Sequence, residues 1–198
     1  MKAVVQNLDS ESKLELYESF IPLQKAIALF ETLRSQVEWK SQAIKIFGRE
    51  VLQPRLVASY ADAGVQFGYS GLKLKSNLWL PELAEIKNHI ENLLAPMSFN
   101  SVLLNYYRHQ QDSMGWHRDN EKELGPNPVI ASLSLGASRD FHLRRYQDKT
   151  DVHKISLSGG SLLVMSGRTQ HDWEHSLPKR QRTIGERINL TFRLVKAI

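Results

Sequence analysis

The stretch Arg187-Ile-Asn-Leu-Thr-Phe-Arg193 decides the fold prediction, because it reads as one strand with two different faces. Side chains of a β-strand point alternately to opposite sides. The apolar side chains therefore share one face: Ile188, Leu190, Phe192 and Leu194. The polar side chains share the other: Arg187, Asn189, Thr191 and Arg193. The apolar face predicts packing against a core, and the polar face predicts either a solvent-exposed surface or the wall of a binding site.

The two arginines of this strand favour the binding site. A separation of six residues spans about 20 Å of extended chain. A guanidinium binds a carboxylate through paired hydrogen bonds and keeps its charge. Arg187 and Arg193 could therefore hold the two ends of one dicarboxylate, with hydrogen bonds from Asn189 and Thr191 between them. The alternative is an amphipathic strand whose arginines face water.

A second motif, His117-x-Asp119, lies earlier in the chain. Residues two apart on an extended segment point the same way, so His117 and Asp119 can bind one metal ion while Trp116 and Arg118 face elsewhere. Two imidazoles and one carboxylate leave positions open on a metal, which is the ligand set of non-haem Fe(II) oxygenases. The motif predicts an enzyme, provided that a second histidine completes the set.

The third ligand must come from another strand, and His171 and His175 both qualify by position. We favour His175. It precedes Arg187 closely, and Leu177-Pro178 marks a turn that could bring the arginine strand back beside the metal. His171 then lies behind the ligands or at the surface.

Composition predicts one soluble domain over residues 1–198, because 41% hydrophobic and 24% charged residues suit a globular chain of this length. The chain has no cysteine, which excludes disulfides, zinc fingers and thiol catalysis. No apolar run is long enough to span a membrane, and residues 1–15 show no signal-peptide core. We expect a monomer that is not secreted, and that is cytoplasmic in a bacterium or nuclear in a eukaryote.

The charge balance favours a polyanionic partner. The chain has 26 Lys and Arg against 21 Asp and Glu, a net charge of +5. The basic residues cluster in two stretches: Arg139, Arg144, Arg145, Lys149 and Lys154, then Lys179, Arg180 and Arg182. A basic face that only contacts solvent is the alternative.

Periodicity predicts helices in the first half and strands in the second. Helices should open at Pro22 and Pro81, with apolar stripes at Leu23, Ala26, Ile27, Phe30 and Leu33 and at Leu83, Ile86, Ile90 and Leu93. Between the two helices, Gly48, Pro54, Gly64, Gly68 and Gly71 separate short segments and suggest hairpins. Strands are expected at 101–107, 129–135, 140–145, 154–157, 161–165 and 187–195. The pattern favours an α+β fold with an antiparallel sandwich or jelly roll.

Several motifs together resemble the AlkB family of Fe(II)- and 2-oxoglutarate-dependent dioxygenases, closest to members that repair alkylated duplex DNA. The matching segments, in chain order, are 53–64, 66–71, Asn105-Tyr-Tyr107, Gly115-Trp-His-Arg-Asp119, 131–136, His175-Ser-Leu-Pro178 and 187–193. The resemblance implies a double-stranded β-helix (jelly-roll) catalytic core over residues 99–198. Residues 1–98 would supply helices and nucleotide-recognition hairpins that form a substrate-binding lid.

The resemblance also implies roles for individual residues. The iron ligands would be His117, Asp119 and His175, with Arg187 completing the catalytic group. The 2-oxoglutarate site would comprise Asn105, Tyr107, Arg187, Asn189, Thr191 and Arg193, with Arg187 and Tyr107 at the distal carboxylate. O2 would take the remaining position on the metal. A flipped base would meet Phe67, Tyr69, Ser70 and Glu121, and Phe47 would sit on a finger hairpin that wedges into duplex DNA.

The activity implied is oxidative demethylation of 1-methyladenine and 3-methylcytosine in DNA, duplex or single-stranded. It would be coupled to decarboxylation of 2-oxoglutarate to succinate, with release of formaldehyde. Two alternatives stay open. The same chemistry could act on RNA or on etheno lesions, or the chain could be a catalytically silent module that binds nucleic acid.

Overall fold

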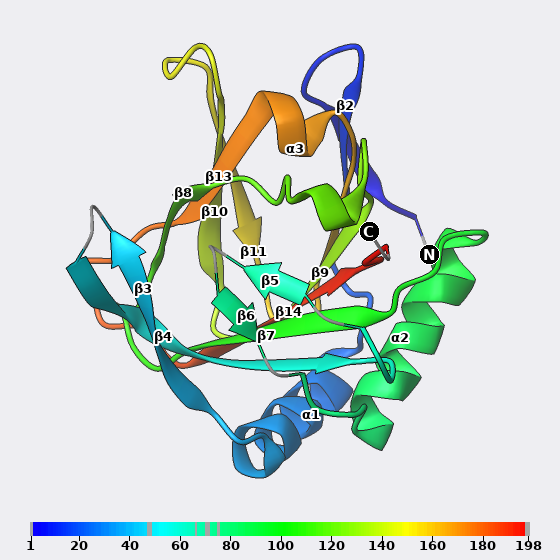
Figure 1. The fold of residues 1–198 in the computed structure, drawn as a ribbon, viewed down its shortest axis with the longest axis vertical. Coiled ribbons are helices and arrows are strands. Elements are labelled where there is room, and N and C mark those ends of the chain that lie inside the picture. Colours follow the sequence, from blue (N-terminus) through cyan, green and yellow to red (C-terminus); the bar gives the residue numbers. More distant parts are fainter. Residues whose placement is uncertain (1, 47–48, 66, 70–71, 75, 197–198) are drawn as a thin grey trace.

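Two antiparallel sheets with helices on one side form the architecture of the chain (Figure 1). The computed structural model describes residues 2–46, 49–65, 67–69, 72–74 and 76–196. Figure 1 shows α1 (Leu23–Gln36) and α2 (Pro81–Leu94) on one side of the long central strands, with the smaller sheet on the other. Within these described ranges, no helix is long and apolar enough to cross a membrane.

The larger sheet contains strands from both halves of the chain. Its order is β1 (Val4–Asn7), β2 (Ser12–Tyr17), β12 (Leu162–Gly167), β9 (Ile130–Gly136), β14 (Arg187–Arg193), β7 (Ser101–Tyr107), β4 (Arg49–Ala61) and β3 (Lys40–Ile46). Because β14 pairs with β9 on one side and β7 on the other, the polar residues of all three strands lie next to one another.

The smaller sheet faces the larger one. Its order is β11 (Val152–Leu157), β10 (Arg139–Arg145), β13 (Trp173–Leu177) and β8 (Met114–His117). A separate hairpin pairs β5 (Phe67–Tyr69) with β6 (Leu72–Leu74), and β3 pairs with β4, so the predicted hairpins are present. Two short helices, η1 (Lys122–Leu124) and α3 (Thr169–Asp172), complete the elements.

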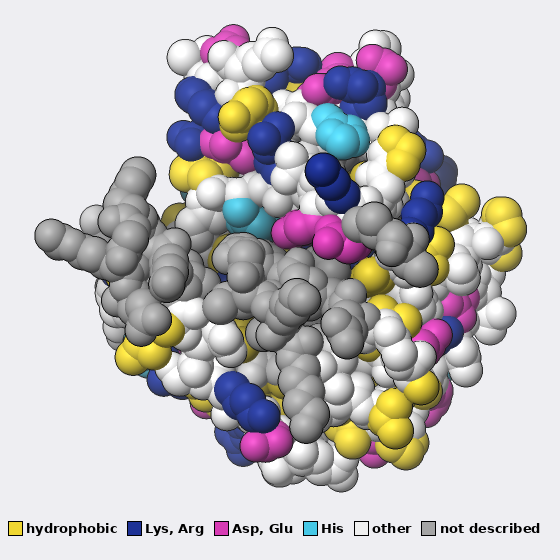
Figure 2. Space-filling model, viewed as in Figure 1, with side chains coloured by type: hydrophobic (Ala, Val, Ile, Leu, Met, Phe, Trp, Pro, Cys, Tyr) yellow, Lys and Arg dark blue, Asp and Glu magenta, His cyan; other side chains and the backbone are white. Residues whose placement is uncertain are grey.

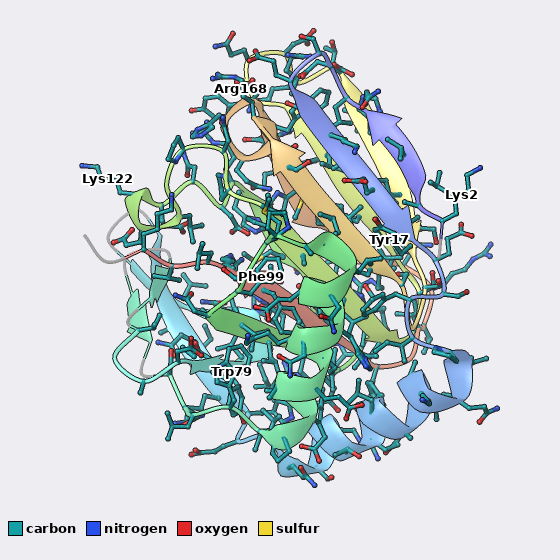
Figure 3. The ribbon with its side chains drawn as sticks, turned by 90° about the vertical axis from the view of Figure 1, so that its right-hand side faces the viewer. Lys2, Tyr17, Trp79, Phe99, Lys122 and Arg168 are labelled. Carbon is teal, nitrogen blue, oxygen red and sulfur yellow. The ribbon has the colours of Figure 1, made fainter. Side chains whose placement is uncertain are left out.

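Two apolar clusters hold these layers together. One lies between the helices and the larger sheet and includes Phe30, Ile90 and Phe192. Figure 3 shows Trp79 and Phe99 beside α2, and both rings contact Phe192 at centroid distances of 6.4 and 6.3 Å. The other cluster lies between the two sheets. Two sheets packed face to face over a shared core make the jelly roll that the sequence predicts.

α2 begins at Pro81, as predicted, since proline suits the first turn of a helix, and α1 begins at Leu23, directly after Pro22. The stripe of α1 is narrower than predicted, however. Ala26, Phe30 and Leu33 are buried, whereas Leu23 and Ile27 are exposed. Ala26, Phe30 and Leu33 lie on the side of the helix that meets the sheet, whereas Leu23 and Ile27 lie beside that face. The prediction that Leu23 and Ile27 join the core is therefore wrong.

The predicted strands are present with shifted ends, and four further strands were not predicted. Leu194 lies beyond the end of β14 and is 39% exposed, so its expected place in the core is wrong. The unpredicted strands are β1, β2, β8 and β13. β13 is only five residues long, Trp-Glu-His-Ser-Leu, and all five residues are buried although Glu174 and Ser176 are polar.

Candidate active site

The three predicted metal ligands come together at one edge of the smaller sheet. His117 ends β8 and pairs directly with His175 of β13, and their ring centroids are 4.2 Å apart. Asp119 follows two residues after His117. One potential ligand atom from each of the three residues lies within 4.8 Å of the others. These three residues could therefore hold one metal ion.

Hydrogen bonds from the surrounding chain orient these side chains. The Nδ1 atom of His117 donates to the Gly115 carbonyl over 2.8 Å, which fixes the orientation of the imidazole ring. The amide of Asp119 donates to Oε1 of Gln170 in α3. Among the described atoms, Oδ1 of Asp119 and Nδ1 of His175 are buried without a hydrogen-bond partner. A buried carboxylate oxygen with no donor and two imidazoles form a set that fits Fe(II).

Electrostatics favours the protonation states that bind metal. Burial, and after it the charge of His117, lowers the pKa of the His175 imidazole to about 3, although the charge of Asp119 opposes this shift. Burial also lowers the pKa of His117, although Asp119 opposes this shift. Burial alone would raise the pKa of Asp119, but the charge of Arg193 and of the two histidines lowers it to about 2. Neutral imidazoles and an ionised carboxylate are the forms that coordinate a cation.

The neighbouring residues of the motif point away from the ligands, as the sequence predicts. The Arg144 guanidinium lies 4.1 Å from the Trp116 ring centroid, and the Arg118 guanidinium lies 3.7 Å from the Tyr146 ring centroid. His171 belongs to α3, where its Nε2 accepts a bond of 3.4 Å from the Asn127 amide. The group of potential ligands formed by the described residues contains His175 and not His171.

A cavity between the two sheets extends from these ligands along the polar face of β14. It is lined by the three ligands and by every residue predicted to bind 2-oxoglutarate: Asn105, Tyr107, Arg187, Asn189, Thr191 and Arg193. All six of these side chains belong to residues that are buried. The alternative of a solvent-exposed polar face is thus wrong, because the smaller sheet covers it.

The polar face is held by hydrogen bonds to β9. Arg187 donates to Oγ of Ser134 over 2.9 Å, and Asn189 donates to Oγ of Ser132 over 2.8 Å. Thr191 in turn donates to Oδ1 of Asn189 over 3.0 Å. Burial lowers the pKa of the Arg187 guanidinium to about 10, so it remains charged at neutral pH. The wall is therefore rigid and positive at the Arg187 end.

Two further contacts shape the part of this wall that the neighbouring strand β7 forms. Nε of buried Arg55 donates to Oδ1 of Asn105 over 2.7 Å, which makes Nδ2 the amide group free to face a ligand. The ring of Tyr107 lies 5.4 Å from the Arg187 guanidinium. In the sheet register, Asn105 and Tyr107 stand directly opposite Asn189 and Arg187. The strand pairing thus places the predicted residues in one site.

The residues predicted to meet a base are only partly described. Glu121 precedes η1 and is half-buried, and it is not among the described residues that line the cavity. Burial and the negative charge of Asp119 raise the pKa of its carboxyl to about 6. Phe67 and Tyr69 belong to β5, but their side chains lie outside the description. Ser70 and Phe47 lie outside the described residues.

The sequence did not reveal the residues that hold the site residues through hydrogen bonds between distant positions of the chain. These are Ser132, Ser134, Gln170 and Arg55. Their partners are between 50 and 57 positions away in the chain. Ser132 and Ser134 alternate with apolar residues in β9, which could have indicated a polar strand face. No local pattern marks Gln170 or Arg55.

Comparisons with known proteins identify the family of this chain. A sequence model of the 2OG-Fe(II) oxygenase superfamily matches residues 13–193. DNA oxidative demethylase ALKBH2 of Arabidopsis thaliana is 39% identical over 96% of this chain and 68% of its own length. The human ALKBH2 is 38% identical over 86% of this chain and 69% of its own. Alpha-ketoglutarate-dependent dioxygenase alkB homolog 3 of Mus musculus is 41% identical over 93% and 66%.

The chain thus spans about two thirds of the length of these relatives. The solved structure of OsALKBH1 shares the fold, with a TM-score of 0.66 at 16% identity over 95% of this chain and all of that one. The family match covers the whole smaller sheet, the larger sheet except for β1 and the first residue of β2, and all three potential ligands. The chain therefore belongs to the AlkB family of Fe(II)- and 2-oxoglutarate-dependent dioxygenases.

Proposed function

We propose that this chain repairs alkylated nucleic-acid bases by oxidative demethylation, with 1-methyladenine and 3-methylcytosine in DNA as substrates. The observation that carries the proposal is the group His117, Asp119 and His175 at one end of a cavity walled by the polar face of β14. The relatives named DNA oxidative demethylase support DNA as the substrate.

In this proposal the three ligands hold Fe(II), and the protein supplies their placement. When bound, iron with 2-oxoglutarate and O2 supplies the oxidation that hydroxylates a methyl group on the base. The hydroxylated methyl group then leaves as formaldehyde. His117 and Asp119 project from one short segment, whereas His175 projects from the paired strand. The two segments would supply three ligands to the metal ion and leave its coordination positions on the cavity side for the co-substrate.

The 2-oxoglutarate site would run along β14 away from the metal. Arg193 already pairs with Asp119, so it belongs to the metal end. Arg187 stands at the other end of the strand beside Tyr107 and is the cation for the far carboxylate. Asn105, Asn189 and Thr191 line the space between. This arrangement differs from the expectation from the strand alone, in which the two arginines hold the two ends of the diacid, because Arg193 is paired with Asp119.

The damaged base would enter next to Glu121. A base inside a duplex must leave the stack before an enzyme can reach its methyl group. Glu121 has a buried Oε2 that lacks a hydrogen-bond partner among the described atoms, and this oxygen could accept a bond from an exocyclic amino group. Phe67, Tyr69 and Ser70 would contact the base, and Phe47 would fill the vacated stack. These roles remain proposals.

Basic side chains near the site would contact the nucleic-acid backbone. Figure 2 shows Lys and Arg side chains gathered over the part of the surface formed by β10, β13 and α3 in Figure 1. Arg144 and Lys149 pair with Glu174, and Arg145 pairs with Asp9. Phosphates would compete with these acidic partners, so we expect affinity to fall as the salt concentration rises.

The experiment is a formaldehyde-release assay with Fe(II), 2-oxoglutarate and O2. The substrates are oligonucleotides with 1-methyladenine or 3-methylcytosine as single-stranded DNA, duplex DNA or RNA. We expect release from methylated DNA and none from unmethylated DNA. Faster release from RNA than from either DNA form would overturn DNA as the substrate. No release from any methylated substrate, with 2-oxoglutarate unconsumed, would favour the silent nucleic-acid-binding module instead.

Glu121→Gln tests the role of the acidic residue in the same assay. The amide keeps the size of the side chain but replaces one acceptor oxygen with a donor. We expect a higher KM for methylated DNA, with the KM for 2-oxoglutarate unchanged. Glu123→Gln, in η1, is the matched control and should behave as the wild type. Equal effects of both substitutions would argue against a specific contact between Glu121 and the base.

A further inference from the structure

Arg139 is a buried cation with unused donors, and it is not on the cavity wall. It opens β10 and is 1% exposed. Its Nη2 donates to the carbonyls of Asp112 and Pro178 over 3.1 and 2.7 Å. Its Nε and Nη1 are buried without a hydrogen-bond partner among the described residues. Nor does any carboxylate of the described residues form an ion pair with this guanidinium.

A second guanidinium lies close to the first. Arg139 and Arg187 lie 5.7 and 5.4 Å from the centroid of the same Tyr107 ring. Burial lowers the pKa of each guanidinium, and the charge of Arg139 contributes to the lowering at Arg187. Two buried like charges repel each other, and burying an unpaired charge is unfavourable. The cluster around Tyr107 therefore has an excess of positive charge that an anion in the cavity would compensate.

We propose that Arg139 is a positioning residue that makes the site prefer a 2-oxo acid with a second, distal carboxylate. Its charge acts through Tyr107 and Arg187, which line the cavity. Its bonds to Asp112 and Pro178 fix the segment before β8 and the segment after β13 around that ring. The inference rests on the proposed 2-oxoglutarate site and deepens it, because it concerns the selectivity of that site.

A purely structural role for Arg139 makes a different prediction. If the guanidinium only joined two carbonyls, its loss would disturb every ligand of the cavity alike. If the charge of Arg139 contributes to binding, its loss should lower the affinity for a ligand with a distal carboxylate and leave the affinity for a ligand without one unchanged. The ratio of the two affinities therefore separates the roles.

The experiment measures ligand binding by calorimetry, with Mn(II) in place of iron so that no turnover occurs. The ligands are 2-oxoglutarate and 2-oxopentanoate, which has the same chain length without the second carboxylate. In R139Q the neutral amide can still donate to a carbonyl, whereas R139K keeps the charge. R180Q is the matched control, because Arg180 is an exposed arginine that pairs with Asp140.

We expect R139Q to weaken 2-oxoglutarate binding by about tenfold, the effect of one buried charge screened by its surroundings. Binding of 2-oxopentanoate should change by less than about twofold, and R139K and R180Q should retain the selectivity of the wild type. If R139Q does not fold, R139M provides a second neutral side chain for the same measurement.

The inference would be overturned if R139Q lost affinity for both ligands by the same factor. It would also be overturned if R139Q bound both ligands as the wild type does. In either case the proposed function would stand, provided that the wild-type protein binds 2-oxoglutarate. If the wild-type protein with Mn(II) bound neither ligand, the proposed 2-oxoglutarate site would fail, and this inference would fail with it.

Discussion

Nη2 of Arg193 lies 2.7 Å from Oδ2 of Asp119, and the two residues are 3% and 1% exposed. This buried ion pair joins β14, which lies between β9 and β7 in the larger sheet, to the potential metal ligand that follows β8. Asp119 therefore uses one oxygen for the protein, and its Oδ1 lacks a hydrogen-bond partner among the described atoms. The same carboxylate links the fold and the metal site.

Removing the cation of this pair should destabilise the protein. Arg193→Leu leaves the carboxylate of Asp119 buried without its ion-pair partner, which typically costs about 3–5 kcal/mol. The free energy of unfolding in urea, with a chelator present, should fall by about that amount. The double variant Arg193→Leu with Asp119→Asn is the control, because it removes the unpaired charge as well. It should recover part of the loss, and a double variant less stable than the single one would contradict this account.

Replacing the preferred third ligand should abolish metal binding. His175→Ala should lose at least about a hundredfold in Mn(II) affinity. Even a residue that only hydrogen-bonds to a metal ligand contributes about 10–100-fold to metal affinity. His171→Ala is the matched control, because this histidine bonds to the Asn127 amide and lies outside the ligand group. Its Mn(II) affinity should remain within about threefold of the wild type. A larger loss in His171→Ala than in His175→Ala would reverse the assignment.

Stability should decline at alkaline pH because of Tyr106. Its hydroxyl donates to the Glu186 carboxylate. Burial, followed by this bond and the negative charge of Glu186, raises the pKa of Tyr106 to about 12. A tyrosine in the unfolded chain has a pKa of about 10. Because the folded value is the higher one, the contribution is complete below about pH 10 and is lost as the pH rises towards about 12.

Tyr106→Phe should remove this part of the pH dependence. Urea denaturation at about pH 9 and pH 11 should show a smaller fall in unfolding free energy for the variant than for the wild type. Parallel curves for the two proteins would mean that another group causes the alkaline loss.

Truncating the centre of the helix-facing core should be strongly destabilising. Phe192 is fully buried on β14 and contacts the rings of Trp79 and Phe99. Phe192→Ala should lower the unfolding free energy by about 3–5 kcal/mol, because a cavity replaces a ring. Leu194→Ala is the control, since Leu194 is exposed just past the strand, and it should change stability by no more than about 0.5 kcal/mol. Similar losses in both variants would contradict the observed burial.

Local patterns in the sequence were enough to identify several elements. The prolines at 22 and 81 marked the starts of both long helices, because Pro22 caps α1 and the fixed backbone angle of Pro81 suits the first turn of α2. The alternation in 187–193 identified β14 and the two sets of side chains on it. The His117-x-Asp119 spacing indicated a shared metal site. Each of these features depends on neighbours within a few positions, where backbone geometry alone decides the direction of a side chain.

Only the tertiary structure decided which strands meet and what covers the polar face of β14. His175 joins His117 because β13 pairs with β8, and the sequence of β13 does not specify that partner. Gln170 accepts a hydrogen bond from the amide of Asp119, 51 positions away. Arg139 donates to the carbonyls of Asp112 and Pro178, 27 and 39 positions away. Such contacts result from sheet pairing and core packing across the whole chain, whereas a periodic pattern specifies a face without naming its partner.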